Sequence, residues 1–456
     1  MQRSPNELLR YIERRLYGHT KLEAVATPLI SVVRGYTERQ PPKSTLPSLG
    51  KGARSHPLER QTYDAQGDPE EATAVARSAP ADISRLVARS ADELKRFVGE
   101  AHAGDTVEVA PGRYRVSATL GTGNPGLSVR PIIVRAAVPG SVILEFAIQE
   151  GFVVSQPYWI FENLVIRGAC GNDSACEHAF HVVGKARGLV IRNNVLQDFN
   201  AQIKVNGLDG NWPDAGLIQF NSIGNSRSRN TGNPVSLIDI VAASRWVVAD
   251  NVISNFNKTG GSGISYGAYM KGAGSDGRFE RNLVICSTSD VSERGSYPWL
   301  GERVGISLGN GGTGPAYCRD QRCAAEHTGG IIRNNIVAHC NDSGIDISRG
   351  VQATVAHNTL INTTGIGLRG VPSSAIVHGN ILEGDIRVRD GGWADSSANR
   401  IGSTARLFDN RDSLALGWVD PPATIPTALK TTKDFCGTAR GSLSFPGALA
   451  DPAACR

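Results

Sequence analysis

The chain has 456 residues, of which 52 are glycine, 2 are methionine and 20% are charged. This composition indicates a soluble β protein punctuated by glycine and asparagine, long enough for one large domain with appendages. The formal net charge of +5 favours an acidic polymer over a neutral one as a partner. There is no concentrated basic stripe, which argues against nucleic acid, and no segment is apolar enough to span a membrane.

The first 81 residues divide into two segments. Apolar side chains recur at helical spacing within residues 1–36, which predicts one or two short helices. Residues 37–81 are rich in Pro, Ser, Arg and Gly without periodicity and are interpreted as a linker. The start is Arg-rich and lacks a continuous apolar core of signal-peptide length. An export signal is therefore missing from this sequence, the start is misassigned, or export uses another route.

A short helix is predicted next, near residues 91–100. Ser90 is followed three residues later by Glu93, the spacing of a capping box at a helix N-terminus. The segment GDTVEVAPGRYRV then indicates a strand, a Pro-Gly turn and a second strand.

An asparagine recurs eight times after a short apolar alternation, at intervals of 22–31 residues with one longer gap of 53. A unit repeated at this interval indicates a solenoid, because one unit cannot bury its apolar face without a neighbour. The alternation is that of strands, and asparagines stacked at one turn are expected to hydrogen-bond from rung to rung. The eight are Asn163, Asn194, Asn221, Asn251, Asn282, Asn335, Asn358 and Asn380.

A short helix followed by GDTVEVAPGRY resembles the opening of right-handed parallel β-helix proteins of the pectate-lyase-like superfamily. The asparagine ladder and the later segments GIDIS and GIGLR are similar to the same proteins. The resemblance implies an all-β fold: a right-handed parallel β-helix solenoid over residues 82–402, with an N-terminal capping helix and an extended C-terminal tail over 403–456. The superfamily hosts lyases, hydrolases, epimerases and adhesins, so the resemblance implies the fold and not the reaction.

A second strand of each repeat carries two apolar residues around one residue that alternation places on the outer face. A parallel column follows two residues later. The first column is His181, Lys204, Asp239, Tyr269, Ser307, Asp346, Gly367 and Arg387, and the second is Val183, Asn206, Val241, Lys271, Gly309, Ser348, Arg369 and Arg389.

The middle of these columns concentrates Lys204, Asp239, Tyr269 and Lys271, within about 10 Å of one another by rung spacing. A lyase acting on a uronate polymer needs a base for the proton beside the carboxylate, a cation on that carboxylate and a proton donor for the leaving oxygen. Lysine and tyrosine suit these roles, with the pKa of one lysine lowered by a second cation. We predict that Lys271 acts as the base or meets the substrate carboxylate, that Tyr269 is the proton donor and that Lys204 is the second cation. Asp239 is predicted to orient Lys271 or to help hold Ca²⁺.

Loops 206–216, 287–303 and 310–329 are expected to form the walls of the substrate groove, because long loops on a rigid coil carry binding residues. The remaining predicted substrate-binding residues are His181, Asn206, Trp212, Arg303, Asp346, Arg349 and Arg369. Trp212 is interpreted either as a sugar-stacking ring or as loop packing. His327, beside Glu326, is interpreted as an acid or base over the groove, or as loop packing.

Other reactions on the same scaffold stay open. A hydrolase needs two carboxylates about 5–9.5 Å apart, whereas the column carboxylates Asp239 and Asp346 are about 14 Å apart by rung spacing. It would need a carboxylate from a loop, namely Asp214, Glu302, Asp320 or Glu326. An epimerase, or a non-catalytic polysaccharide-binding protein such as an adhesin, is also compatible with the sequence.

The eight cysteines are placed for four disulfides, since short loops or neighbouring rungs separate them. The predicted pairs are Cys170–Cys176, Cys286–Cys340, Cys318–Cys323 and Cys436–Cys455, the last clamping the tail. Disulfides imply an oxidising compartment, so an extracellular or periplasmic monomer is expected.

Overall fold

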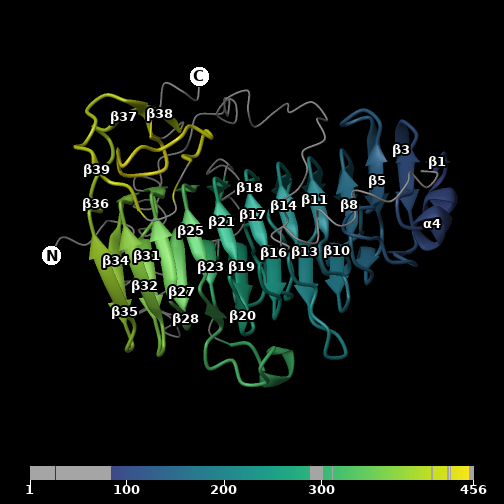
Figure 1. Cartoon of the computed structure of the whole chain (residues 1–456), viewed down its shortest axis with the longest axis horizontal. Coiled ribbons are helices and arrows are strands. Elements are labelled where there is room, and N and C mark those ends of the chain that lie inside the picture. The colour runs from purple at the N-terminus through teal and green to yellow at the C-terminus, as the bar shows by residue number, and fades with distance from the viewer. Residues whose placement is uncertain are drawn as a thin grey trace.

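Three long parallel sheets wind into one coil (Figure 1), and each turn contributes strands to sheet A, sheet B and sheet C in that order. The computed structural model describes residue 26 and residues 84–287, 301–310, 312–411, 414–428, 431 and 433–450. The fold is the right-handed parallel β-helix that the resemblance implies, and its repeated turns form the solenoid that the asparagine repeat predicts. The helices expected within residues 1–36, the linker 37–81 and most of the loop 287–303 lie outside the described residues.

Among the described residues, sheet A has twelve strands, sheet B eleven and sheet C ten. Sheet A contains β1 (Arg85–Ala88), β2 (Thr106–Val109), β5 (Ile132–Ala136), β8 (Trp159–Glu162), β11 (Val190–Arg192), β14 (Leu217–Gln219), β17 (Val247–Ala249), β21 (Arg278–Glu280), β25 (Ile331–Arg333), β29 (Ala353–Ala356), β32 (Ser374–His378) and β35 (Trp393–Ser397). Sheet B contains β3 (Gly112–Val116), β6 (Val142–Phe146), β9 (Val165–Gly168), β12 (Val195–Gln197), β15 (Ser222–Gly224), β18 (Val252–Ser254), β22 (Leu283–Ile285), β26 (Ile336–Ala338), β30 (Thr359–Ile361), β33 (Ile381–Leu382) and β36 (Arg400–Ile401). Sheet C contains β4 (Leu120–Gly121), β7 (Glu150–Val154), β10 (His178–Val183), β13 (Ala201–Asn206), β16 (Val235–Val241), β19 (Ile264–Lys271), β23 (Glu302–Leu308), β27 (Ile345–Ser348), β31 (Gly365–Arg369) and β34 (Asp385–Arg389).

Shorter elements complete the described part of the chain. A small parallel sheet, which we call sheet G, follows sheet C in three turns, and the tail adds two antiparallel pairs. Sheet G contains β20 (Gly274–Ser275), β24 (His327–Thr328) and β28 (Gly350–Val351). The tail pairs are β37 (Phe408–Asn410) with β38 (Ala415–Trp418), and β39 (Ile425–Pro426) with β40 (Leu443–Ser444); single turns of 3-10 helix are η2 (Asp173–Ala175) and η4 (Pro315–Tyr317).

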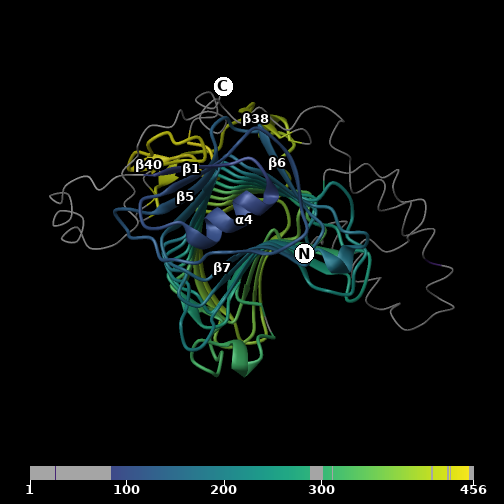
Figure 2. The same cartoon turned by 90° about the vertical axis from the view of Figure 1, so that its right-hand side faces the viewer.

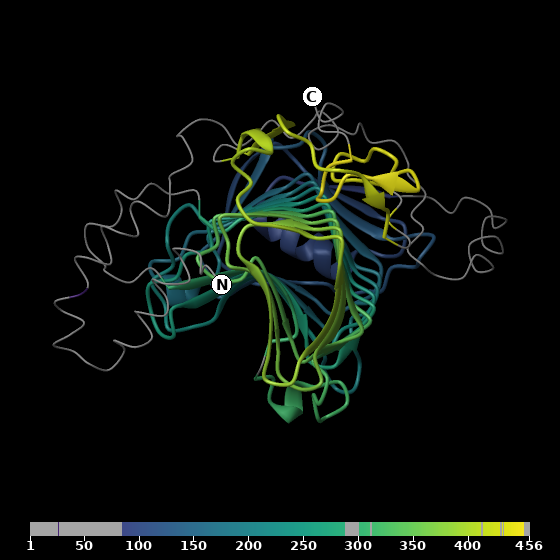
Figure 3. The same cartoon turned by 90° about the vertical axis from the view of Figure 1, so that its left-hand side faces the viewer.

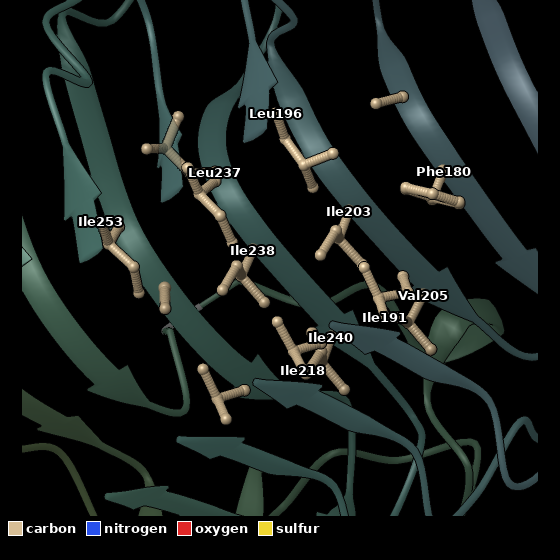
Figure 4. Close-up of a cluster of buried hydrophobic side chains, with 14 of the residues drawn as sticks. Phe180, Ile191, Leu196, Ile203, Val205, Ile218, Leu237, Ile238, Ile240 and Ile253 are labelled. Atoms are coloured by element: carbon tan, nitrogen blue, oxygen red, sulfur yellow. The ribbon is translucent and has the colours of Figure 1, made fainter. Parts of the chain in front are cut away.

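The interior of the coil is apolar because alternate side chains of every strand point into it. Figure 4 shows this core in the middle turns, where Ile191 and Ile218 of sheet A, Leu196 of sheet B and Ile238 of sheet C belong to the same buried cluster. Aromatic rings fill the N-terminal turns, with Phe152 and Phe180 stacked at 5.2 Å between ring centroids. Each turn therefore buries its apolar face only against the turns beside it.

An asparagine ladder follows sheet A on the inside of the turn into sheet B. From Asn194 onward, each amide Nδ2 donates to Oδ1 of the next asparagine at 2.9–3.2 Å. The prediction that Asn163 begins the ladder is wrong by one residue. Leu164 occupies that register and donates its N–H to Asn194 Oδ1, while Asn163 lies at the preceding position with φ 65°. At the other end the ladder runs one rung further than predicted, to Asn399.

Helix α4 (Ala91–Glu100) lies across the N-terminal end of the coil (Figure 2). Its start is that of a capping box: Ser90 Oγ accepts the Glu93 N–H, and the Glu93 carboxylate accepts the N–H of Arg89. Leu94 and Val98 are fully buried against the first turns. The helix covers an end of the coil that would otherwise expose apolar interior to water.

The C-terminal tail packs along the side of the coil and not across its end (Figure 3). Phe408 and Leu416 of the tail lie against the outer face of sheet B, where Ile336 and Ile361 point outward. Arg440 adds two hydrogen bonds to Asn334 Oδ1, at 3.2 and 3.0 Å. The tail was predicted to pack back as an extended cap. It does pack back onto the coil, but it covers the outer face of sheet B.

Three of the predicted disulfides are present: Cys170–Cys176, Cys286–Cys340 and Cys318–Cys323. Cys436 is also disulfide-bonded, and its predicted partner Cys455 lies outside the described residues. In the part of the chain described here, no helix is both long and apolar enough to cross a membrane.

Candidate functional site

The outer face of sheet C carries the first predicted column in unbroken register. Backbone pairing joins His181 to Lys204, Lys204 to Asp239 and Asp239 to Tyr269. The same register continues from Tyr269 through Ser307, Asp346 and Gly367 to Arg387. Strand alternation alone was enough to align these side chains, because parallel pairing preserves the face of each residue.

Lys204, Asp239, Tyr269 and Lys271 form what we call the sheet C cluster. Lys204 Nζ donates to Asp239 Oδ2 at 2.7 Å, and Asp239 is buried at 5% exposure. Burial acts to raise the pKa of Asp239, but Lys204 and Lys271 outweigh it and hold the pKa below its usual value. Asp239 is thus an ionised carboxylate held between two cations.

The aromatic ring of Tyr269 lies beneath the Lys271 ammonium. The Lys271 ammonium lies 4.8 Å from the centroid of the Tyr269 ring, a cation–π arrangement. Burial, followed by the neighbouring charge of Asp239, raises the pKa of Tyr269 well above its usual value. The phenol therefore stays protonated near neutral pH, in the form that can donate a proton.

Lys271 differs from Lys204 in its partners. Within the described residues Lys271 has no ion pair within 4 Å, whereas Lys204 is bonded to Asp239. Burial lowers the pKa of Lys271 below its usual value; the charge of Asp239 opposes this decrease, and Lys204 adds to it. A half-buried lysine that loses its proton more easily is the state a general base requires.

On the N-terminal side of the cluster, His181 bridges two turns. Its Nδ1 lies 2.8 Å from Glu150 Oε1 and its Nε2 lies 2.8 Å from Asn206 Oδ1. The ring of His178 lies 5.2 Å from that of His181, and burial lowers the pKa of His178 to about 4. His181 and Asn206 are therefore fixed polar groups beside the cluster: His181 lies one turn from Lys204, and Asn206 lies on the same strand as Lys204.

On the C-terminal side, the predicted arginines are paired or buried. Arg369 binds Asp346 through two hydrogen bonds, at 3.2 and 2.9 Å, and Arg349 binds Glu326 at 2.7 Å. Arg303 is buried at 4% exposure and its backbone N–H donates to Asn341. Burial raises the pKa of Asp346, with Arg369 opposing the shift.

Two loops project from the lower edge of the coil beside the cluster (Figure 1), residues 206–216 after β13 and residues 312–326 after β23. Arg319 joins them with two hydrogen bonds to Asp214, at 2.7 and 3.0 Å, and its guanidinium lies 4.7 Å from the Trp212 ring. Trp212 also packs against the Val241 and Tyr269 side chains. Of its two interpretations, the loop-packing one is what these contacts support.

His327 is not over the outer face of sheet C, so its predicted role there is wrong. Its side chain is 1% exposed, and Nε2 accepts the Gly277 N–H at 3.1 Å. Burial lowers the pKa of His327 to about 4. The residue begins β24 of sheet G, an element that the sequence analysis did not anticipate, and alternation there turns His327 inward.

The residues around Asp239 do not fit a calcium site. Calcium takes six to eight oxygen ligands, whereas the charged neighbours of Asp239 are the two lysines. The one grouping of potential metal ligands among the described residues is Cys318, Asp320 and Cys323, and these two cysteines are bonded to each other. We therefore derive no chemical step from calcium.

These observations define a parallel β-helix protein with a charged, loop-flanked outer face on sheet C. Its structure is similar to that of the pectate lyase Pel9A, with a TM-score of 0.52 and 12% identity, covering 81% of this chain and 97% of that chain. It also matches a PL6 family polysaccharide lyase from Pseudopedobacter saltans (TM-score 0.36, 15% identity, 74% of this chain and 96% of that chain). A lacto-N-biosidase from Eubacterium ramulus matches with a TM-score of 0.43 and 12% identity, over 68% of this chain and 64% of that chain.

No protein-family model matches the chain, and no curated protein matches it. At these identities the likeness to Pel9A establishes the pectate-lyase-like fold alone. Function has to be argued from the residues of the site.

Of two further residues that matter to the site, Glu150 was not assigned to it from the sequence, and Glu326 was named only as a carboxylate that a hydrolase would need. Glu150 holds His181, and Glu326 contacts the peptide after Lys271. Glu150 begins β7. The turn of the coil that contains β7 has no ladder asparagine from which the register of the strand could have been predicted. Glu326 lies at the end of a long insertion, where strand periodicity gives no signal.

Proposed function

We propose that this protein is a polysaccharide lyase that cleaves a uronate-containing polymer by β-elimination. The observation that carries the proposal is Lys271: a half-buried ammonium on the outer face of sheet C, without an ion pair among the described residues and with a lowered pKa. Lysines with lowered pKa values serve as general bases. The likeness of the fold to a pectate lyase is consistent with this chemistry but does not carry it.

In the proposed reaction, neutral Lys271 takes the proton from the sugar carbon next to the carboxylate. The electrons of that C–H bond form a double bond to the neighbouring carbon, and the bond from that carbon to the glycosidic oxygen breaks. The leaving oxygen takes a proton from the Tyr269 hydroxyl, and Tyr269 is later reprotonated from Lys271 or water. Lys204 lies two turns from Lys271, on β13, and supplies positive charge toward the substrate carboxylate, shared with Asp239.

Hydrolysis is less well supported, because the described carboxylates near this face are already engaged. Asp239 is paired with Lys204, Asp346 with Arg369 and Glu326 with Arg349. Asp214 binds Arg319, and Asp320 is held by the backbone N–H groups of Arg322 and Cys323. A hydrolase needs one carboxylic acid and one carboxylate open to the same bond.

The test is incubation with alginate, pectate, glucuronan and glycosaminoglycans while the ultraviolet absorbance of the unsaturated product is followed. We expect absorbance to rise with at least one polymer and not with its carboxyl-reduced form. New reducing ends without absorbance would indicate a hydrolase, and binding without either signal would indicate a binding protein or adhesin. Inversion of the configuration at the ring carbon that bears the carboxylate, without cleavage, would indicate an epimerase.

Tyr269→Phe sharpens the test, because it removes the hydroxyl and keeps the ring under Lys271. We expect kcat to fall about 100-fold, the usual size of a general-acid contribution. Full activity in this variant would assign proton donation to water or another group.

Three disulfides support an oxidising compartment, so we propose an extracellular or periplasmic location.

A further inference from the structure

The loop 312–326 ends in a carboxylate that is fully buried. The Glu326 side chain has 0% exposure, and each of its oxygens accepts two hydrogen bonds. Oε1 accepts from Arg349 at 2.7 Å and from the Thr313 N–H at 3.2 Å. Oε2 accepts from the Thr313 hydroxyl at 2.7 Å and from the Gly272 N–H at 3.0 Å. A buried carboxylate with this many donors is fixed in place.

The Gly272 contact ties the loop to the site, because Gly272 directly follows Lys271. The Gly272 carbonyl accepts the Arg319 N–H of the same loop at 2.9 Å. Gly272 has φ +79°, and a Cβ there would approach the Ala242 nitrogen to 2.7 Å. Both hydrogen-bonding groups of this residue are therefore held by the loop, in a conformation that other residues rarely adopt.

Glu326 also faces Lys271 electrostatically. The charged groups that act on the Lys271 ammonium come from three elements: Lys204 on β13, Asp239 on β16 and Glu326 at the end of the loop. Tyr269, on the same strand as Lys271, contributes its ring face. Of these groups, Glu326 is the carboxylate whose ion-pair partner, Arg349, does not belong to the sheet C cluster.

We propose that Glu326 is a positioning residue for Lys271. It anchors the inserted loop to the peptide that follows Lys271, and so holds the ammonium over the Tyr269 ring. Its negative charge also favours the protonated form of the lysine, so its loss should make the amine neutral at lower pH. The inference rests on the proposed function only for the role of Lys271 in the reaction; the contacts and the charge effect do not depend on it.

The test compares Glu326→Gln with Glu162→Gln in the full chain. Glu162, on β8 of sheet A, is also buried and paired with an arginine, Arg192, so it controls for losing a buried Glu–Arg pair elsewhere. The pKa of Lys271 is measured without substrate, by NMR titration of protein with isotopically dimethylated lysines, the signal being assigned from its loss in Lys271→Arg. We expect a lower pKa in Glu326→Gln and an unchanged pKa in Glu162→Gln.

With a polymer that the wild type cleaves, Glu326→Gln should reduce kcat about 100-fold, the cost of a displacement of about 1 Å in a catalytic group. The pH at which kcat reaches half its plateau should move to lower pH with the pKa. An unchanged Lys271 pKa and pH midpoint in Glu326→Gln would overturn the inference. If the wild type cleaves no polymer, the proposed function fails while the titration still decides the inference.

Thr313→Val is the variant to use if Glu326→Gln does not fold. It removes one hydrogen bond to the carboxylate and keeps the charge. We expect a several-fold lower kcat with the pH midpoint kept, because position is disturbed and charge is not. An unchanged kcat would show that the loop anchor does not position Lys271, and would equally overturn the inference.

Discussion

The outer faces of sheet B and sheet C have opposite chemical character, although both are built on parallel strands of the same coil. On sheet B, Ile336 and Ile361 point outward and are covered by the tail through Phe408 and Leu416. On sheet C, ions take the place of these apolar side chains. Burial of apolar area stabilises a fold by about 25 cal/mol per Å², whereas half-buried charges carry a desolvation cost that pairing only partly offsets. The outer face of sheet B contributes to stability, and the charges of sheet C need another explanation, which the proposed function would supply.

The largest effect expected from this difference is on activity. Lys271→Ala should reduce kcat by about 1,000-fold, within the range of a lost general base. Its midpoint of thermal unfolding should stay within a few degrees of the wild type, because the ammonium makes no ion pair in the described structure. Lys185→Ala, at an exposed turn position, is the control and should retain full rate. A variant of Lys271 that unfolds, or that keeps most of its rate, would place the chemistry elsewhere.

On sheet B we expect the opposite result: a substitution should lower stability and leave the activity of the folded protein unchanged. Phe408 is 3% exposed and stacks on Trp418 at 4.9 Å. Phe408→Ala should lower the free energy of unfolding by about 3 kcal/mol through lost burial and the cavity left behind. The measurement is denaturant unfolding, with kcat per folded molecule as the second readout. A fall in kcat for the folded fraction would contradict the separation of the two faces.

The coil should lose stability in acid through buried histidines such as His327. His327 is buried and its pKa is lowered from 6.5 to about 4, so the folded state binds this proton less readily than the unfolded state. Stability from this residue is present above pH 6.5 and is lost as the pH falls toward about 4. The slope is at most about 1.4 kcal/mol per pH unit. His327→Gln should reduce that slope in urea titrations, and an unchanged slope would assign the acid sensitivity to other groups.

The smallest effect concerns the pH dependence of catalysis. The rate should rise with pH as Lys271 loses its proton, with a midpoint below 10.5 because burial lowers its pKa. Lys204→Met removes a neighbouring cation that disfavours the protonated form of Lys271, so the midpoint should move to higher pH. A midpoint that moves to lower pH, or does not move, would show that the two lysines are not coupled.

Strand periodicity was sufficient to predict the columns of sheet C, because an alternation of two residues fixes the face of every side chain. It was not sufficient at the turn into sheet B. There asparagine suits two adjacent positions, the ladder and the left-handed residue before it, and Asn193 and Asn334 occupy the latter. Asn163 is in that second position and was assigned to the first. Asn399 was missed because the strand after it, Arg400–Ile401, begins with a charged residue, unlike the strands after the predicted asparagines.

The site was predicted less completely than the fold. Lys204, Asp239, Tyr269 and Lys271 lie together as expected, since they belong to the regular part of each turn. The contacts of Glu326 and His327 come from an insertion and a short extra sheet, where side-chain direction depends on packing. Two of the disulfide pairs could be predicted from the sequence, because short loops hold Cys170 near Cys176 and Cys318 near Cys323 and leave few other pairings.

The last described turn of the coil, β34 to β36, has a consequence for molecules in a crowded solution. Val388 and Ile401 are 45% and 43% exposed there, and terminal strands offer backbone groups to which another chain can add. Head-to-tail growth would require the opposite end of a second molecule, and α4 covers that end. Two last turns brought together would instead set equal charges of Arg387 and Arg389 against each other in a parallel stack. In the described structure α4 therefore blocks the addition of a further strand at its end of the coil, although the repeat itself could continue.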